Sequence, residues 1–182
     1  MLFYSPMERP RPRFLPCALV AILAAAVYIR TLGFGFVFDD QHLIVGNAFL
    51  RESWSPLRAF AHHFWYGTRS GTGYYRPLVV ASLALNGRIL GWGPFGFHLV
   101  NVWLHATNAA LVFVLGRRLG LQDRPASLAA ALFAVHPAAS WAVASIVARV
   151  DLLAAFFVLL AWISCASAGW PRWRSAALCG TF

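Results

Sequence analysis

A series of apolar runs, each close to the length of a membrane-spanning helix, constrains the fold of this chain most. A helix needs about 20 mostly apolar residues to cross the hydrocarbon core of a bilayer. Runs of this kind occupy about 14–31, 97–115, 125–148 and 152–168, and another starts shortly before Phe182. Since 60% of the residues are hydrophobic and only 12% are charged, a soluble domain is disfavoured. We therefore predict an all-α, polytopic membrane protein with about four spans and the start of a fifth.

The predicted domain organisation follows from these runs. Residues 1–13 are rich in proline and arginine and should form a disordered basic segment, and residues 14–182 should form one membrane domain. The N-terminal arginines resemble the start of a signal peptide, but the following run is long and no small-residue cleavage pattern follows it, so we expect an uncleaved first helix. His136-Pro137 should kink or end the third span, because proline has no backbone N–H to donate.

The distribution of arginine predicts the orientation. The net charge of +9 comes from 15 arginines without any lysine, and their scatter between apolar runs argues against a nucleic-acid partner. With four crossings, the arginines of the short segments fall on one side: Arg9, Arg11, Arg13, Arg117, Arg118, Arg124, Arg172 and Arg174. The positive-inside rule makes that side cytoplasmic. We expect a protein of the cell (inner) membrane with a cytoplasmic N-terminus and a long first loop, about 34–96, on the outer side.

Two short helices are predicted in this first outer loop. Ser55-Pro56 has the pattern of a helix start, and apolar residues follow at helical spacing: Leu57, Phe60, Ala61 and Phe64. This spacing predicts an amphipathic helix that lies flat in the membrane interface. A second apolar helix, about 77–90, is short for a full crossing, and we expect it to be half-buried or re-entrant.

The acidic pair Asp39-Asp40 is the leading candidate for chemistry. It follows the first span and contains two of the six acidic residues. Phe34, Phe36 and Phe38 place it at a membrane–water boundary, where aromatic rings settle. A carboxylate near apolar walls has a raised pKa, which suits a general base that takes a proton from a hydroxyl. A water-exposed acidic turn at a helix end fits the dipeptide equally well.

Other residues predicted on the outer side are candidates for binding a phosphate. Arg149 and Arg76 have guanidinium groups that can hold a phosphate through paired hydrogen bonds, with Asp151 as a supporting partner. The alternatives are interfacial arginines that extend to water and an aspartate that caps a helix. His136 is either a ligand for the phosphate or a structural histidine at the proline kink.

Four polar residues form a stripe on one face of the second span: His98, Asn101, His105 and Asn108. Polar groups inside a membrane face the bundle interior or a wet cavity. We expect His98 and Asn101, nearest the outer side, to line a cavity, and His105 and Asn108 to join helices by hydrogen bonds. No cysteine or histidine spacing predicts a metal site, although a divalent metal stays an open alternative.

An ordered set of short motifs resembles one protein family. The motifs are Phe36-Val37-Phe38-Asp39-Asp40, Tyr75-Arg76-Pro77-Leu78, Asn86, Gly91-x-x-Pro94-x-x-Phe97-His98-Leu99-x-Asn101, Leu104-His105, Asn108, Leu132-Phe133-Ala134-x-His136-Pro137 and Val147-x-Arg149-x-Asp151-Leu152-Leu153. In this order, over about residues 30–165, they resemble the TMTC-type proteins. These are membrane O-mannosyltransferases with C-terminal tetratricopeptide repeats, and they belong to the GT-C superfamily of glycosyltransferases.

The resemblance implies a function and a set of site residues. The chain would be the N-terminal part of a glycosyltransferase that moves a sugar, such as mannose, from a polyprenyl-phosphate donor to an acceptor hydroxyl at the outer face, with inversion. Asp39 would be the base and Asp40 its partner. The substrate or lipid-phosphate ligands would be Arg149, Arg76, His136, His98, Asn101 and Asp151. The partners would be the donor lipid and a protein or glycan acceptor, with the lipid-linked sugar as a co-substrate rather than a bound cofactor.

The sequence departs from the family in two respects. Relatives carry a His-Pro-x-x-Thr-Glu pattern, whereas this chain has Ser140-Trp141 at the last two positions. Tetratricopeptide repeats with a 34-residue period are also missing. We therefore expect the chain to be incomplete, with the remainder of the enzyme encoded downstream. A non-catalytic or degenerate scaffold of the same fold and a transporter fragment stay open as alternative functions.

Overall fold

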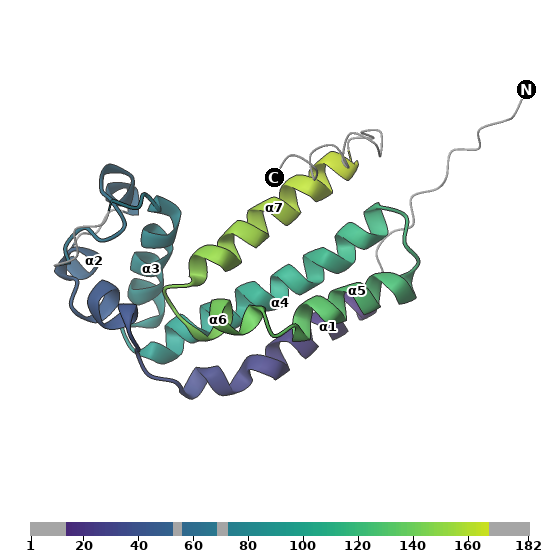
Figure 1. Ribbon diagram of the computed structural model, residues 1–182, viewed down its shortest axis with the longest axis horizontal. Helices are drawn as coiled ribbons and strands as arrows, with labels where there is room; N and C mark the ends of the chain where they lie inside the picture. Colours follow the sequence, from purple (N-terminus) through teal and green to yellow (C-terminus); the bar gives the residue numbers. More distant parts are fainter. Residues whose placement is uncertain (1–13, 53–55, 69–72, 168–182) are drawn as a thin grey trace, which may run out of the picture.

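A computed structural model describes residues 14–52, 56–68 and 73–167 of the chain, and its regular elements there are all helical. Long helices lie side by side in an elongated bundle, and the short helices of the first loop gather at one end of it (Figure 1). The predicted all-α membrane fold is confirmed. The basic segment 1–13 and the start of a fifth span lie outside the described residues.

Three helical stretches are long and apolar enough to cross a membrane. The first combines α1 (Phe14–Tyr28) with the 3₁₀ turn η1 (Ile29–Gly33), and the others are α4 (Pro94–Arg118) and α7 (Arg149–Ser167). They correspond to the predicted first, second and fourth spans. Pro94 lies in the first turn of α4, where its missing N–H costs nothing.

The predicted third span is broken into two helices. α5 (Asp123–Val135) has 13 residues, or roughly 20 Å of helix, which is too short to cross a bilayer alone. His136 leaves the helical conformation with ψ near 130°, as expected for a residue before proline, and α6 (Ala139–Ala144) follows. Together α5 and α6 run back along α4 (Figure 1). The break predicted at His136-Pro137 is therefore confirmed.

Small residues allow α5 to pack closely against its neighbours. Ala126, Ala130 and Ala134 recur every four residues, so they lie on one face, and all three are fully buried. They share a cluster with Ala24 of α1 and Ala109 of α4. Small side chains let helix backbones approach closely, which matters in a membrane because lipid tails are as apolar as the helices themselves.

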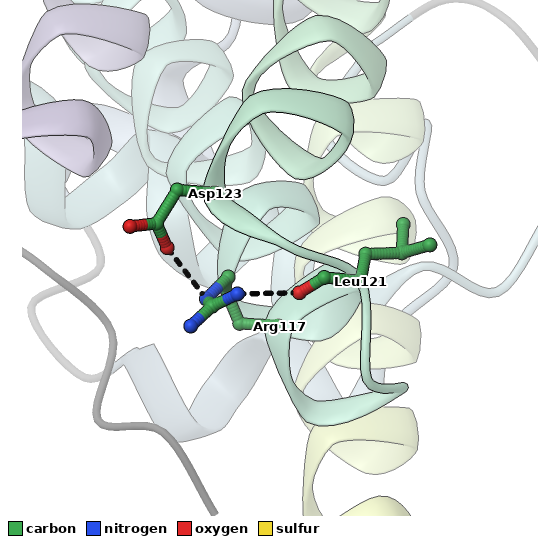
Figure 2. Close-up of polar contacts among 3 residues, drawn as sticks. All are labelled: Arg117, Leu121 and Asp123. Carbon is green, nitrogen blue, oxygen red and sulfur yellow. Dashed lines mark hydrogen bonds and ion pairs between the residues drawn. The ribbon is translucent and has the colours of Figure 1, made fainter.

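An ion pair closes the connection between α4 and α5. Arg117 Nε lies 2.9 Å from Asp123 Oδ1, and the same guanidinium donates a hydrogen bond to the Leu121 carbonyl (Figure 2). Gly120 has a φ of 93° in this turn, a conformation that costs glycine little. The turn holds α5 antiparallel to α4.

The first loop packs around an apolar core that it shares with Phe97 of α4 and with Ile146 and Val147. It contains the π-helical turn η2 (Gln41–Val45), α2 (Ala48–Glu52), the 3₁₀ helix η3 (Pro56–Ala61) and α3 (Pro77–Leu90). A helix begins at Pro56 as predicted, but it is a short 3₁₀ helix that ends at Ala61 and does not reach Phe64, whose N–H bonds the Tyr74 carbonyl. The predicted helix at about 77–90 is confirmed as α3.

The alanine face of α5 yields a stability prediction. We expect Ala130→Leu to destabilise the protein by about 1–3 kcal/mol, because the larger side chain cannot fit between α1, α4 and α5. Ala129→Leu is the matched control, since Ala129 is exposed on the same helix. Thermal unfolding in detergent measures both variants, and equal midpoints would contradict the packing described here.

Candidate functional site

The two carboxylates of the acidic pair lie in opposite environments. Asp39 is exposed, whereas Asp40 is fully buried. The Asp40 N–H donates to the Val37 carbonyl at 2.9 Å, and Asp40 Oδ2 accepts the Val37 N–H at 3.2 Å. Gln41 Nε2 adds a bond to the Phe36 carbonyl at 2.9 Å. These bonds close a tight turn in which Asp39 is the carboxylate that stays open to its surroundings.

Phe38 occupies a strained position in this turn. Its φ is 45°, and it is the one non-glycine residue with positive φ in the described part of the chain. The left-handed conformation costs an L-residue about 1–2 kcal/mol. The Phe38 ring is 78% exposed, so packing does not offset that cost. The hydrogen bonds made by Asp40 and Gln41 must hold the turn, and strain of this kind is concentrated at functional sites.

Asp40 also ties the turn to the connection between α6 and α7, 107 residues later in the chain. Its Oδ1 accepts the Val147 N–H at 3.1 Å. Burial raises the pKa of Asp40, hydrogen bonds from the backbone at Val37, Val147 and Ile146 lower it, and the Asp39 charge raises it, with a net increase. The raised carboxylate pKa expected near apolar walls is thus found at Asp40.

Arg149, the first residue of α7, is fully buried and bonds to two other helices. Its Nε donates to Asn101 Oδ1 of α4 at 2.8 Å, and its Nη2 donates to Asn86 Oδ1 of α3 at 2.8 Å and to the Phe97 carbonyl at 3.0 Å. Nη1 lies 3.4 Å from the Ser82 carbonyl. The guanidinium therefore joins α3, α4 and α7, and its predicted contact with a phosphate stays a prediction.

Asn101 connects Arg149 to the α6–α7 connection. While its Oδ1 accepts from Arg149, its Nδ2 donates to the Ser145 carbonyl at 3.0 Å and approaches the Val143 carbonyl at 3.4 Å. Asn101 is fully buried, so it joins helices rather than lining a cavity as the sequence suggested. His98, one turn before it, is also buried. Its ring lies edge-on to Phe34, and neither ring nitrogen makes a well-formed hydrogen bond to the described residues.

The other two polar residues of α4 join helices, as predicted. Asn108 Nδ2 donates to the Leu152 carbonyl at 2.9 Å, and His105 Nε2 lies 3.0 Å from the Ala134 carbonyl. These bonds satisfy backbone carbonyls on α7 and α5. The stripe on α4 is therefore an interhelical hydrogen-bond seam over most of its length.

Arg76 lies outside the buried cluster that Arg149 forms with Asn101 and Asn86. It precedes α3, and its guanidinium carbon lies 5.2 Å from the Phe64 ring centre and 5.0 Å from the Tyr74 ring centre. Such cation–π contacts hold a guanidinium without using its hydrogen-bond donors. Arg76 is half-buried and forms no ion pair with a described residue, so its N–H groups are free to meet an anion.

His136 and Asp151 line a separate cavity of about 400 Å³ between α4, α5, α6 and α7. Both side chains are exposed, and the rest of the wall is mostly apolar. His105 and Asn108 add polar groups deeper in it, and Asn108 Oδ1 is buried without a hydrogen-bond partner among the described residues. Across the described ranges, no group of three or more His, Cys, Asp or Glu residues could hold a metal ion.

The comparisons with known proteins agree with the motifs. The chain is 42% identical over 152 residues to the protein O-mannosyl-transferase Tmtc2 and 44% identical over 147 residues to Tmtc1, both of Drosophila melanogaster. It is 39% identical over 170 residues to TMTC4 of Homo sapiens. This chain is a TMTC-type relative. The resemblance inferred from the motifs is confirmed over 81%, 78% and 84% of the chain, respectively.

The similarity covers a small part of those relatives. The chain spans 16% of Tmtc2, 17% of Tmtc1 and 23% of human TMTC4. No family model matches the chain, and no solved structure gives a significant match.

Sequence reasoning assigned no role to several groups that build the buried cluster. Asn86 belongs to the ordered motifs, and a polar residue within the apolar run 77–90 is the signal that could have assigned it to an interhelical contact. The Ser82 and Phe97 carbonyls and the Val147 N–H are backbone groups. Any residue type supplies them, so no sequence pattern marks them.

The strained turn predicts opposite effects of two substitutions at Phe38 on the stability of the protein. We expect Phe38→Asn to raise stability by roughly 0.5–1 kcal/mol, because asparagine tolerates positive φ. Phe38→Val should lower stability by about 1 kcal/mol or more, since a β-branched residue fits that conformation worst. Thermal unfolding midpoints measure both, and a stabilising valine would contradict the backbone geometry.

The raised pKa of Asp40 predicts a pH dependence of stability. The folded protein binds the Asp40 proton more tightly than the unfolded chain, whose carboxyl has a pKa of about 4. The stabilisation that comes from this tighter proton binding is fully present below about pH 4, and it is lost as the pH rises through the raised pKa of the folded state. We expect the free energy of unfolding of wild type relative to Asp40→Asn to fall across that range. An increase with pH would show that the Asp40 pKa is depressed instead.

Proposed function

We propose that this chain is part of an integral-membrane glycosyltransferase that moves a sugar from a polyprenyl-phosphate donor to an acceptor hydroxyl at the outer membrane face. The observation that carries the proposal is the exposed Asp39 on a strained, hydrogen-bonded turn at one end of the bundle. The similarity to proteins named O-mannosyl-transferases supports mannose as the sugar. The arginines at the opposite, α4–α5 end support an outer location for the acidic turn.

Asp39 is the proposed general base. In the reaction, the Asp39 carboxylate takes the proton of the acceptor hydroxyl as its oxygen bonds to the anomeric carbon. The bond from that carbon to the phosphate oxygen breaks, and polyprenyl phosphate leaves with the electron pair. Attack opposite the leaving group inverts the anomeric centre. Of the two carboxylates, Asp39 is the one exposed to an incoming acceptor.

Fixed positive charge is needed where the phosphate develops a second negative charge, and a site poor in water strengthens the effect. Arg76 is the proposed ligand, because its guanidinium is oriented by two aromatic rings and has no ion-pair partner among the described residues. His136 is a second candidate, since it is exposed at a largely apolar cavity.

A transfer assay tests the base assignment. Membranes containing the longest protein that the gene encodes are supplied with labelled polyprenyl-phosphate mannose, and label transferred to membrane protein or glycan is counted. We expect Asp39→Asn to lower the rate by about 10²–10⁴-fold, the usual contribution of a general base. Asp123→Asn is the control, because it removes a carboxylate in the α4–α5 turn. Undiminished transfer by Asp39→Asn would contradict the assignment, and absence of transfer by wild type would favour a scaffold.

A further inference from the structure

We infer that Arg149, Asn101 and Asp40 form a positioning chain, which holds Asp39 in place from inside the bundle rather than contacting the donor. The inference rests on the proposed function of Asp39. It assigns Arg149 a role different from the phosphate ligand that the sequence suggested. The positioning chain is built from three hydrogen bonds between segments that are far apart in the sequence: Arg149 to Asn101, Asn101 to Ser145, and Val147 to Asp40.

The first step is the burial of Arg149. Its side chain is fully inaccessible, and Nε, Nη1 and Nη2 all point to acceptors within the protein. A buried guanidinium stays charged only when its donors are satisfied, which the two asparagine oxygens and the Phe97 carbonyl achieve. A phosphate could reach it only after these bonds break. The geometry therefore favours a fixed internal anchor.

The second step runs from this anchor to the α6–α7 connection. Asn101 accepts from Arg149 and donates to the Ser145 carbonyl, and the Arg149 N–H itself donates to the Ile146 carbonyl at 3.2 Å. Residues 145–148 are all buried. Side-chain and backbone bonds from one anchor thus fix the connection from both ends.

The third step connects the α6–α7 connection to the acidic turn. The Val147 N–H donates to Asp40 Oδ1, and Asp40 Oδ2 accepts the Val37 N–H. The two oxygens of one carboxylate therefore join the α6–α7 connection to the strained turn at Phe38.

The fourth step is the effect on Asp39. Phe38 stays in its left-handed conformation only while the surrounding bonds hold it, and Asp39 is the next residue. If the anchor moves, the turn can relax and swing the Asp39 carboxylate. A displacement of about 1 Å at a catalytic group can cost about 100-fold in rate.

A double-mutant cycle in the same full protein tests this inference. Arg149→Lys leaves the charge but cannot bond three acceptors in the guanidinium geometry, and Asp40→Asn replaces one accepting oxygen by a donor. We expect each to lower kcat at least 10-fold with an unchanged KM for polyprenyl-phosphate mannose. The double variant should be no slower than the slower single variant. An Arg149→Lys variant with raised donor KM and unchanged kcat, or additive losses, would overturn the inference.

Two further variants keep the test informative. Asn101→Asp retains the acceptor for Arg149 but loses the donor to Ser145, so it should reproduce the kcat loss if Arg149→Lys fails to fold. Phe113→Leu is the matched control, because Phe113 is equally buried on α4 but packs against α1 and α5 and does not line the cavity at His136. It should lower the thermal midpoint without altering kcat of the folded protein. An equal kcat loss in Phe113→Leu would overturn the inference, since general loosening would then explain the effect.

The cycle is also measured as shifts in thermal midpoint, which need no sugar transfer. Coupled, non-additive shifts for Arg149→Lys and Asp40→Asn are expected, and additive shifts would overturn the positioning chain. Absence of transfer by wild type, together with coupled shifts, would overturn the proposed function alone.

Discussion

A single buried guanidinium, that of Arg149, holds together the end of the bundle that carries the acidic turn. An uncompensated charge inside a protein or membrane costs several kcal/mol, so Arg149 can be buried only where the fold supplies acceptors. α3 supplies the Asn86 oxygen and α4 supplies the Asn101 oxygen and the Phe97 carbonyl. Each of these elements must therefore lie at a fixed position relative to α7. Apolar packing alone would not impose this, because one apolar helix face resembles another in lipid.

The acidic pair divides two tasks between neighbouring residues. Asp40 points inward and bonds the backbone at Val37 and Val147, while Asp39 stays exposed. A pair of exposed carboxylates would repel each other and raise both pKa values. Burial of one lets the other act alone, and the strain at Phe38 is the cost of turning successive side chains in opposite directions.

Sequence reasoning predicted the helical membrane fold because apolar length and proline placement are local properties. The break at His136-Pro137 and the helix at 77–90 followed from them. The start of a helix at Pro56 also followed from them, but its 3₁₀ form and its end at Ala61 did not, and the bond between Phe64 and Tyr74 just beyond it joins residues ten apart. At the site, the sequence identified Asp39, Asp40 and Arg149 as a set. It did not predict that the latter two are buried, because their partners are distant residues and backbone groups.

Hydrogen exchange at the α6–α7 connection and the acidic turn tests the central claim most directly. In wild type, the Val147 and Val37 amides should be protected, because both donate to the buried Asp40 carboxylate. We expect Arg149→Lys to accelerate exchange at both amides together. In Asn108→Ala, the exchange rates of these two amides relative to those of the other amides in the bundle should stay unchanged. Faster exchange confined to the start of α7, with Val37 still fully protected, would contradict the account.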